Sequence, residues 1–166
     1  MCRNLKEVGI SLNALNINRR AFYFCDSLTS VIIPDSVTSI GDYAFNQCKS
    51  MTSVNIPDSV TTIGEAAFQN CQSLTSVTIG NSVKSINEET FRKCKKLINI
   101  NIPNSVKSIE EYAFRECSSL TSITFGYNLT SITISTNVTS IGLGAFQKCT
   151  SLTSVEIPNS VISISS

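Results

Sequence analysis

The chain has 166 residues, a net charge of +1, no histidine, no tryptophan and only 7% aromatic residues. Without histidine, neither a Ser-His-Asp nor a Cys-His nucleophile can be assembled, and no glycine-rich phosphate-binding motif occurs. Neighbouring carboxylates such as Glu88-Glu89 and Glu110-Glu111 are typical of solvated charges on an exposed turn. The composition therefore argues against an enzyme, and we expect neither a cofactor nor a metal.

The dominant feature of the sequence is a period of 23 residues. Six cysteines follow this period, namely Cys2, Cys25, Cys48, Cys71, Cys94 and Cys117, and phenylalanines keep the same step at Phe22, Phe45, Phe68, Phe91 and Phe114. A fixed period of this length predicts a solenoid, in which each unit covers the apolar face of its neighbours. We expect residues 1–166 to form a single solenoid of about seven coils.

The repeat that starts at residue 28 predicts how one coil is built. Residues 28–33 are β-branched and partly alternate between apolar and polar, which predicts a short strand. Pro34 ends this strand because proline has no N–H for a ladder. Residues 37–40 predict a second short extended arm, and residues 42–48 have the apolar spacing of one helical turn. Stacked coils would place equivalent residues about 4.8 Å apart, so Leu28, Val31 and Ile33 should continue inner columns.

The period breaks once, between Cys117 and Cys149, which are separated by the step of 23 plus nine further residues. The insertion, near 126–134, resembles a duplicated arm because "LTSITFGYN" is followed by "LTSITISTN". Insertions in solenoids map to the surface and often to binding sites, so Tyr127 and Asn128 belong to a candidate contact loop. The alternative is an accident of repeat slippage.

The cysteines are interpreted as a ladder of reduced, buried thiols. Each stands at the same place in its coil, beside an inward phenylalanine, and acts as a small apolar residue. Side chains on successive rungs point the same way, whereas a disulfide needs opposed Cβ vectors. Zinc is disfavoured as well, because the chain has no histidine and no Cys-x-x-Cys pair.

The outward positions of the first strand form columns along the predicted solenoid. The first two columns are mostly threonine and serine, whereas the third varies from coil to coil. Variable residues on a regular face are where a repeat protein would recognise a partner. The candidate partner-binding residues of this column are Ile32, Asn55, Thr78, Asn101, Thr124 and Glu156. The alternative is that they provide only solubility and strand propensity.

A basic cluster stands out in the segment "RKCKK", residues 92–96. Its Lys95 and Lys96 are further candidate partner-binding residues, since such a cluster suits an acidic protein surface, an anionic glycan or nucleic acid. Nucleic acid is disfavoured because nearby glutamates offset the charge and no aromatic side chains interleave for base stacking. We therefore expect a protein partner and no nucleic acid.

Neither end of the sequence carries a polar cap for its terminal coil. Solenoids normally need such caps, so we expect either a piece of a longer array or ends that make end-to-end or assembly contacts. No apolar run has the length of a signal peptide core or a membrane span, so direct membrane insertion is not expected. By this criterion the chain would be cytoplasmic.

The motifs "LTSVTIGNSVKSI" and "IPDSVTSIGDYAFNQC" resemble the BspA-type leucine-rich repeats of bacterial and protist surface proteins. The resemblance covers essentially the whole chain. It implies a solenoid similar to leucine-rich repeats, with short parallel strands, a second extended arm and one helical turn per 23-residue coil. It also implies a non-enzymatic protein-binding module of the cell surface, of the adhesion type. The alternative is an intracellular structural or scaffold component docked into a larger assembly.

Overall fold

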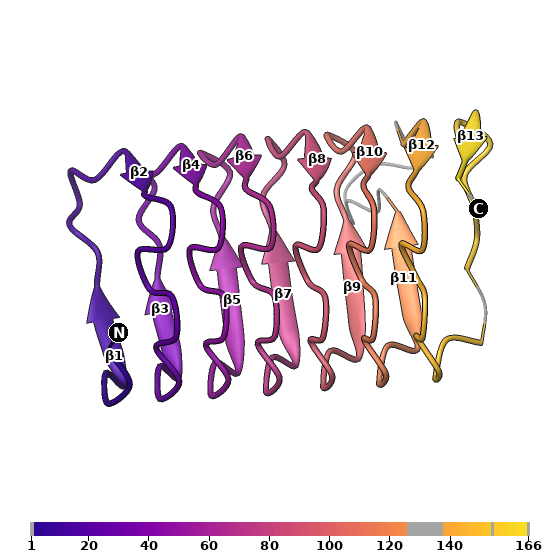
Figure 1. The fold of residues 1–166 in the computed structure, drawn as a ribbon. Helices are drawn as coiled ribbons and strands as arrows, with labels where there is room; N and C mark the ends of the chain where they lie inside the picture. Colours follow the sequence, from indigo (N-terminus) through magenta and orange to yellow (C-terminus); the bar gives the residue numbers. More distant parts are fainter. Residues whose placement is uncertain (1, 126–137, 154, 166) are drawn as a thin grey trace.

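The computed structural model describes residues 2–125, 138–153 and 155–165. The strands in this part of the chain are β1 (Glu7–Gly9), β2 (Asn16–Ile17), β3 (Ser30–Ile32), β4 (Ser39–Ile40), β5 (Ser53–Ile56), β6 (Thr62–Ile63), β7 (Ser76–Ile79), β8 (Ser85–Ile86), β9 (Asn99–Ile102), β10 (Ser108–Ile109), β11 (Ser122–Phe125), β12 (Ser140–Ile141) and β13 (Ser163–Ile164). Figure 1 shows the coils side by side, from β1 at one end to β13 at the other. The predicted repeat solenoid is confirmed.

The strands form two sets of parallel ladders along the solenoid. The longer strands pair as β1-β3, β5-β7 and β9-β11, and the shorter strands pair as β2-β4-β6 and β8-β10-β12-β13. Partners occupy the same place in the repeat, as in Val54 opposite Val77. Across the longer connection, Ser108 lies opposite Ser140 in the same register. The ladder of short strands therefore keeps its register although one coil contains nine extra residues.

The core is a set of continuous apolar columns inside the coils. Leu28, Val31 and Ile33 are buried as predicted, whereas Ile32 between them is 81% exposed. An exposed, buried, exposed, buried alternation occurs in β5, β7, β9 and β11. Because side chains alternate across a strand, each coil places one row of its apolar residues against its two neighbours.

One phenylalanine from each of six coils forms a stack through the middle of the molecule. Neighbouring rings lie 5.1 to 5.9 Å apart between centroids and are tilted by no more than 17°. The stack contains Phe22, Phe45, Phe68, Phe91, Phe114 and Phe146. The four central rings are completely buried, which provides a large apolar core in a chain with few aromatic residues.

The prediction of a helical turn at residues 42–48 is wrong. The N–H of Ala44 donates to the carbonyl of Gly41, and the N–H of Cys48 donates to the carbonyl of Phe45, so these bonds close four-residue turns. The N–H of Phe45, between them, donates instead to Ala67 in the next coil. Alternate donors thus link neighbouring coils, whereas an α-helix would use them all within itself. The described residues contain no helix.

These turns hold residues other than glycine in the left-handed region. In the turn of one coil, Tyr43 has φ of 57° and Gln47 has φ of 65°, and the same two places recur along the solenoid. The conformation costs about 1 to 2 kcal/mol for a residue with a Cβ atom. The bonds between coils therefore hold the backbone in a conformation that the side chains do not prefer.

Lys148→Gly should raise the free energy of unfolding by about 0.5 to 1 kcal/mol, because glycine adopts positive φ without the Cβ penalty. Lys148 is exposed and has φ of 60°, so little else changes. The matched control is Lys95→Gly, at an exposed position outside the left-handed region, which should destabilise the protein by a similar amount. Urea unfolding followed by circular dichroism measures both. If both substitutions changed the free energy of unfolding equally and in the same direction, the left-handed backbone at Lys148 would not be a source of strain.

The cysteine ladder is confirmed for the cysteines from Cys25 to Cys149, which are buried and free, while Cys2 in the first coil is exposed. Each thiol from Cys48 onward donates to the carbonyl of a phenylalanine in the preceding coil, with Sγ···O distances of 3.1 to 3.3 Å. Burial raises the pKa of the Cys48 thiol from 9.0 to about 12. These thiols are packed as apolar groups and are poor nucleophiles.

Candidate interaction surfaces

The longer strands present one regular exposed surface, here called the strand face. Its variable column contains Ile32, Asn55, Thr78, Asn101 and Thr124, all of which are exposed. Register places Asn55 directly opposite Thr78 and Asn101 opposite Thr124. Glu156 is also exposed, but it lies outside the strands of the described residues. Five of the six residues predicted for this column therefore lie on the longer strands, on one exposed surface.

The threonines beside this column are less polar than their sequence suggests. The Oγ1 hydroxyls of Thr29, Thr75 and Thr121 each donate to the carbonyl of the residue one coil earlier, at 3.0 Å. Those hydroxyls can still accept a hydrogen bond, but their hydrogens are no longer free to donate. With Ile32 81% exposed and Ile98 48% exposed, the strand face offers methyl groups, acceptors and a few amides.

The basic cluster is only partly free for contact. Lys95 and Lys96 are exposed on the turn that leads into β9. Arg92 instead forms an ion pair with Glu89, and its second terminal nitrogen lies 3.9 Å from a Glu116 carboxylate oxygen. The two lysines therefore remain candidates, while the arginine beside them is neutralised by its own chain.

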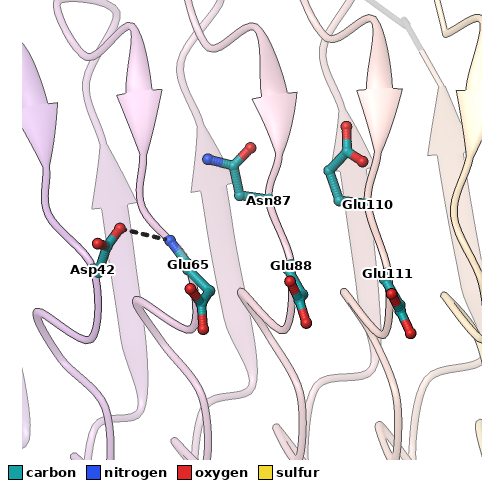
Figure 2. A pocket seen from close by; sticks show the side chains of 6 residues that line it. All are labelled: Asp42, Glu65, Asn87, Glu88, Glu110 and Glu111. Carbon is teal, nitrogen blue, oxygen red and sulfur yellow. Dashed lines mark hydrogen bonds between the residues drawn. The ribbon is translucent and has the colours of Figure 1, made fainter.

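An acidic groove runs along the turns on another side of the coils (Figure 2). It is open to solvent, has a volume of about 390 Å³, and is lined by Asp42, Glu65, Asn87, Glu88, Glu110 and Glu111. The backbone N–H of Glu65 donates to the Asp42 carboxylate at 3.0 Å. Desolvation in the groove and the neighbouring carboxylates of Glu65, Glu111 and Glu89 raise the pKa of the exposed Glu88.

Sequence reasoning recognised the glutamate pairs of this groove only as solvated charges. The signal that would have found the groove is the 23-residue step from Asp42 through Glu65 and Glu88 to Glu111. The same step places one acidic residue per coil on one side of the solenoid, because stacked coils repeat at the spacing of paired strands, about 4.8 Å. Within the described ranges, no group of three Cys, Asp or Glu side chains is placed to hold a metal ion.

Two further expectations concern other parts of the chain. Tyr127 and Asn128 of the candidate contact loop, with the rest of the 126–134 insertion, lie outside the described residues. Among the residues that the structure does describe, no helix has the length and apolar character needed to cross a membrane.

Parallel coils with continuous apolar columns and an exposed strand face define a repeat solenoid protein. The family described as BspA type leucine rich repeat region matches residues 15–132 and 126–166, in six copies. The chain therefore belongs to the BspA-type leucine-rich repeat family, as its repeat motifs predicted.

Solved structures with the same fold come from bacteria. A leucine-rich repeat protein from Eubacterium ventriosum is 25% identical, with a TM-score of 0.84, and the match covers 97% of this chain and 41% of that one. One from Bacteroides ovatus is 27% identical, with a TM-score of 0.82, covering 98% and 46%. A leucine rich cell surface protein from Faecalibacterium prausnitzii is 27% identical, with a TM-score of 0.70, covering 92% and 48%.

The present chain spans less than half the length of each of these three proteins. No curated protein matches it.

Proposed function

We propose that the chain is a non-enzymatic protein-binding repeat module of the cell-surface adhesion type, and that it recognises its partner through the strand face. Support comes from the BspA-type family and from the similarity to a leucine rich cell surface protein. Repeat arrays bind through extended surfaces whose outward residues differ from repeat to repeat. We also propose that the chain forms one solenoid of about seven coils within a longer array.

The observation that carries this proposal is the variable column of the strand face. Its backbone is regular, because β5 pairs with β7 and β9 pairs with β11, each in unbroken register. Its side chains differ in size and chemistry, from the exposed Ile32 to the amides of Asn55 and Asn101. A rigid scaffold with changing outward residues is suited to reading a partner surface, whereas solubility alone would require no such variation.

The test replaces Asn55 and Asn101 together by arginine and measures binding to a panel of immobilised cell-surface and extracellular-matrix proteins by surface plasmon resonance. We expect at least about a tenfold loss of affinity for any protein that binds, since central interface positions dominate binding energy. The matched control adds the same two charges at Thr61 and Thr139, exposed positions beside the ladder of short strands. An equal loss in the control would contradict recognition by the strand face.

A second candidate function, an intracellular scaffold component, is favoured by the exposed apolar ends. Leu12 and Leu15 of the first coil are 81% and 61% exposed, and Ile162 and Ile164 beside or in β13 are 87% and 61% exposed. Such side chains suit assembly contacts or cover by further coils.

Protease and antibody accessibility on intact and permeabilised cells of the source separates the two functions. Access on intact cells supports the adhesion module. Access only after permeabilisation would overturn it in favour of the scaffold.

A further inference from the structure

A cluster of arginine and tyrosine side chains lies on the turns of the first two coils, away from the strand face. Arg20 stacks over two rings, with its Cζ atom 5.4 Å from the centroid of Tyr43 and 5.5 Å from that of Tyr23. Arg19 adds a second guanidinium, 5.8 Å from the Tyr43 centroid. The Tyr43 hydroxyl donates to the Glu65 carboxylate, which holds the shared ring in place. These four residues, Arg19, Arg20, Tyr23 and Tyr43, are called the arginine–tyrosine cluster.

The two guanidiniums differ from those of the arginines farther along the chain. Arg92 pairs with Glu89, and the Arg115 Nε atom lies 3.7 Å from a Glu116 carboxylate oxygen. Arg19 and Arg20 are exposed, and their side chains form neither an ion pair nor a hydrogen bond with any part of the chain that the structure describes. Their N–H groups are therefore oriented by stacking and free to bind an external acceptor.

The chemistry of that acceptor follows from the guanidinium. Its planar fork matches a carboxylate with two parallel charge-assisted hydrogen bonds, and a stacked arginine loses less conformational freedom on binding. Tyrosine and arginine are also, with tryptophan, the residues enriched among the few that dominate binding energy at protein interfaces. A cluster of two such arginines on one ring is suited to one or two carboxylates presented close together.

The neighbouring charges decide between a carboxylate and a polyanion. Arg19 occupies the place in its coil that Asp42 occupies in the next, and the same column continues with Glu65 and Glu88. A nucleic acid or sulfated glycan that covered the cluster would extend over these carboxylates and be repelled. An isolated acidic side chain reaches the arginines without meeting that repulsion.

We propose that the arginine–tyrosine cluster is a carboxylate-binding site that receives Asp or Glu side chains of a protein partner. This inference goes beyond the strand-face proposal, because it assigns a separate surface and a defined chemical group.

The test is a titration of the isotope-labelled chain with succinate, followed by NMR of the arginine Nε–H resonances. We expect saturable shifts of the Arg19 and Arg20 signals and none with the neutral succinamide. Inorganic phosphate should bind more weakly than succinate. The Arg3 signal is the internal control, because Arg3 is exposed in the same coil and stacks on no ring in the described part of the chain.

Three variants distinguish the contributions of the planar guanidinium and of stacking on Tyr43 from the contribution of positive charge alone. The double variant R19K/R20K keeps the charge and should bind succinate about tenfold more weakly, because lysine lacks the planar fork. Binding to this variant is followed by the backbone amide signals of residues 19 and 20, which are compared with those of the unmodified chain. Y43L should weaken binding about threefold by removing the shared ring, whereas Y43F, which keeps the ring and loses only its bond to Glu65, should weaken binding less than Y43L does. Circular dichroism confirms the fold of each variant.

Four results would overturn the proposal: no saturable shift, an equal shift at Arg3, tighter binding of phosphate, or unchanged binding by R19K/R20K. The strand-face variant N55R/N101R should bind succinate as the unmodified chain does. Loss of its partner binding with unchanged succinate binding supports two separate sites, so the two proposals can fail independently.

Discussion

Phe68→Ala is expected to lower the free energy of unfolding by about 4 kcal/mol, the middle of the range for removal of a buried aromatic side chain. Phe68 is fully buried and stacks on Phe45 at 5.2 Å and on Phe91 at 5.6 Å between ring centroids. Its removal leaves a cavity with a ring on either side. Because each coil contacts only its neighbours, the defect weakens the coupling between the two halves of the solenoid.

The matched control for this variant is Phe22→Ala in the first coil. Phe22 is only half-buried and stacks on Phe45 alone, at 5.1 Å, so we expect a loss of about 1 to 2 kcal/mol. Urea unfolding measures both losses, and a broadened or biphasic transition in Phe68→Ala would report the weakened coupling. Equal losses in the two variants would show that the stack does not stabilise the centre more than the end.

Alkaline pH is expected to unfold the protein steeply, between about pH 10 and 11. Burial raises the thiol pKa of Cys48 from 9.0 to about 12, and raises the pKa of Cys71, Cys94 and Cys117 well above 9.0. Above about pH 9 the unfolded chain loses these protons while the folded chain keeps them. Stability is therefore fully present below about pH 9, and each thiol removes about 1.4 kcal/mol per pH unit above it.

Four such thiols together give a slope of about 5 to 6 kcal/mol per pH unit, which exceeds the net stability of a typical domain within one to two units. Urea unfolding from pH 8 to 11, with a reductant present, measures the slope. Cys71→Ala should make the slope shallower by about 1.4 kcal/mol per pH unit, although it also lowers stability at pH 8. An unchanged slope would contradict the assignment to buried thiols.

The repeat pattern was sufficient to predict the strands and the core. Alternation at residues 28–33 predicted which side chains point inward, because a strand side chain can lie on only one of two faces. Pro34 at the end of that segment predicted the corner, since it cannot extend the ladder. The 23-residue step then predicted the columns, including the buried thiols from Cys25 onward.

The turn at residues 42–48 was predicted incorrectly because two structures share its apolar spacing. Ala44, Phe45 and Cys48 face inward in the observed turns, as they would in a single helical turn. Whether a helical turn or the observed turns form depends on the acceptors of alternate N–H groups, such as that of Phe45. These acceptors lie one coil away. No local pattern contains that information, because it arises only when the coils are stacked.

One candidate surface could be predicted from the sequence, and the other could not. The variable column from Ile32 to Thr124 could be predicted from the repeat, since the place of a residue in a strand is a local property. The arginine–tyrosine cluster could not, because the ring of Tyr43 comes from one coil and the guanidiniums of Arg19 and Arg20 come from the coil before. The nearby glutamates were expected to offset the charge of "RKCKK", and the structure shows that Arg92 is the side chain that pairs with Glu89.

The sequence alone determined that this protein is a repeat solenoid, which residues form its core, and which column of its strands varies. These features follow from a period and from the alternation of side chains, and both are properties of the chain itself. Only the tertiary structure decided that the turns are not helical, that threonine hydroxyls donate to the preceding coil, and that two arginines stack on one tyrosine. Each of these depends on contacts between residues about one repeat apart, whose geometry exists only after the coils have stacked.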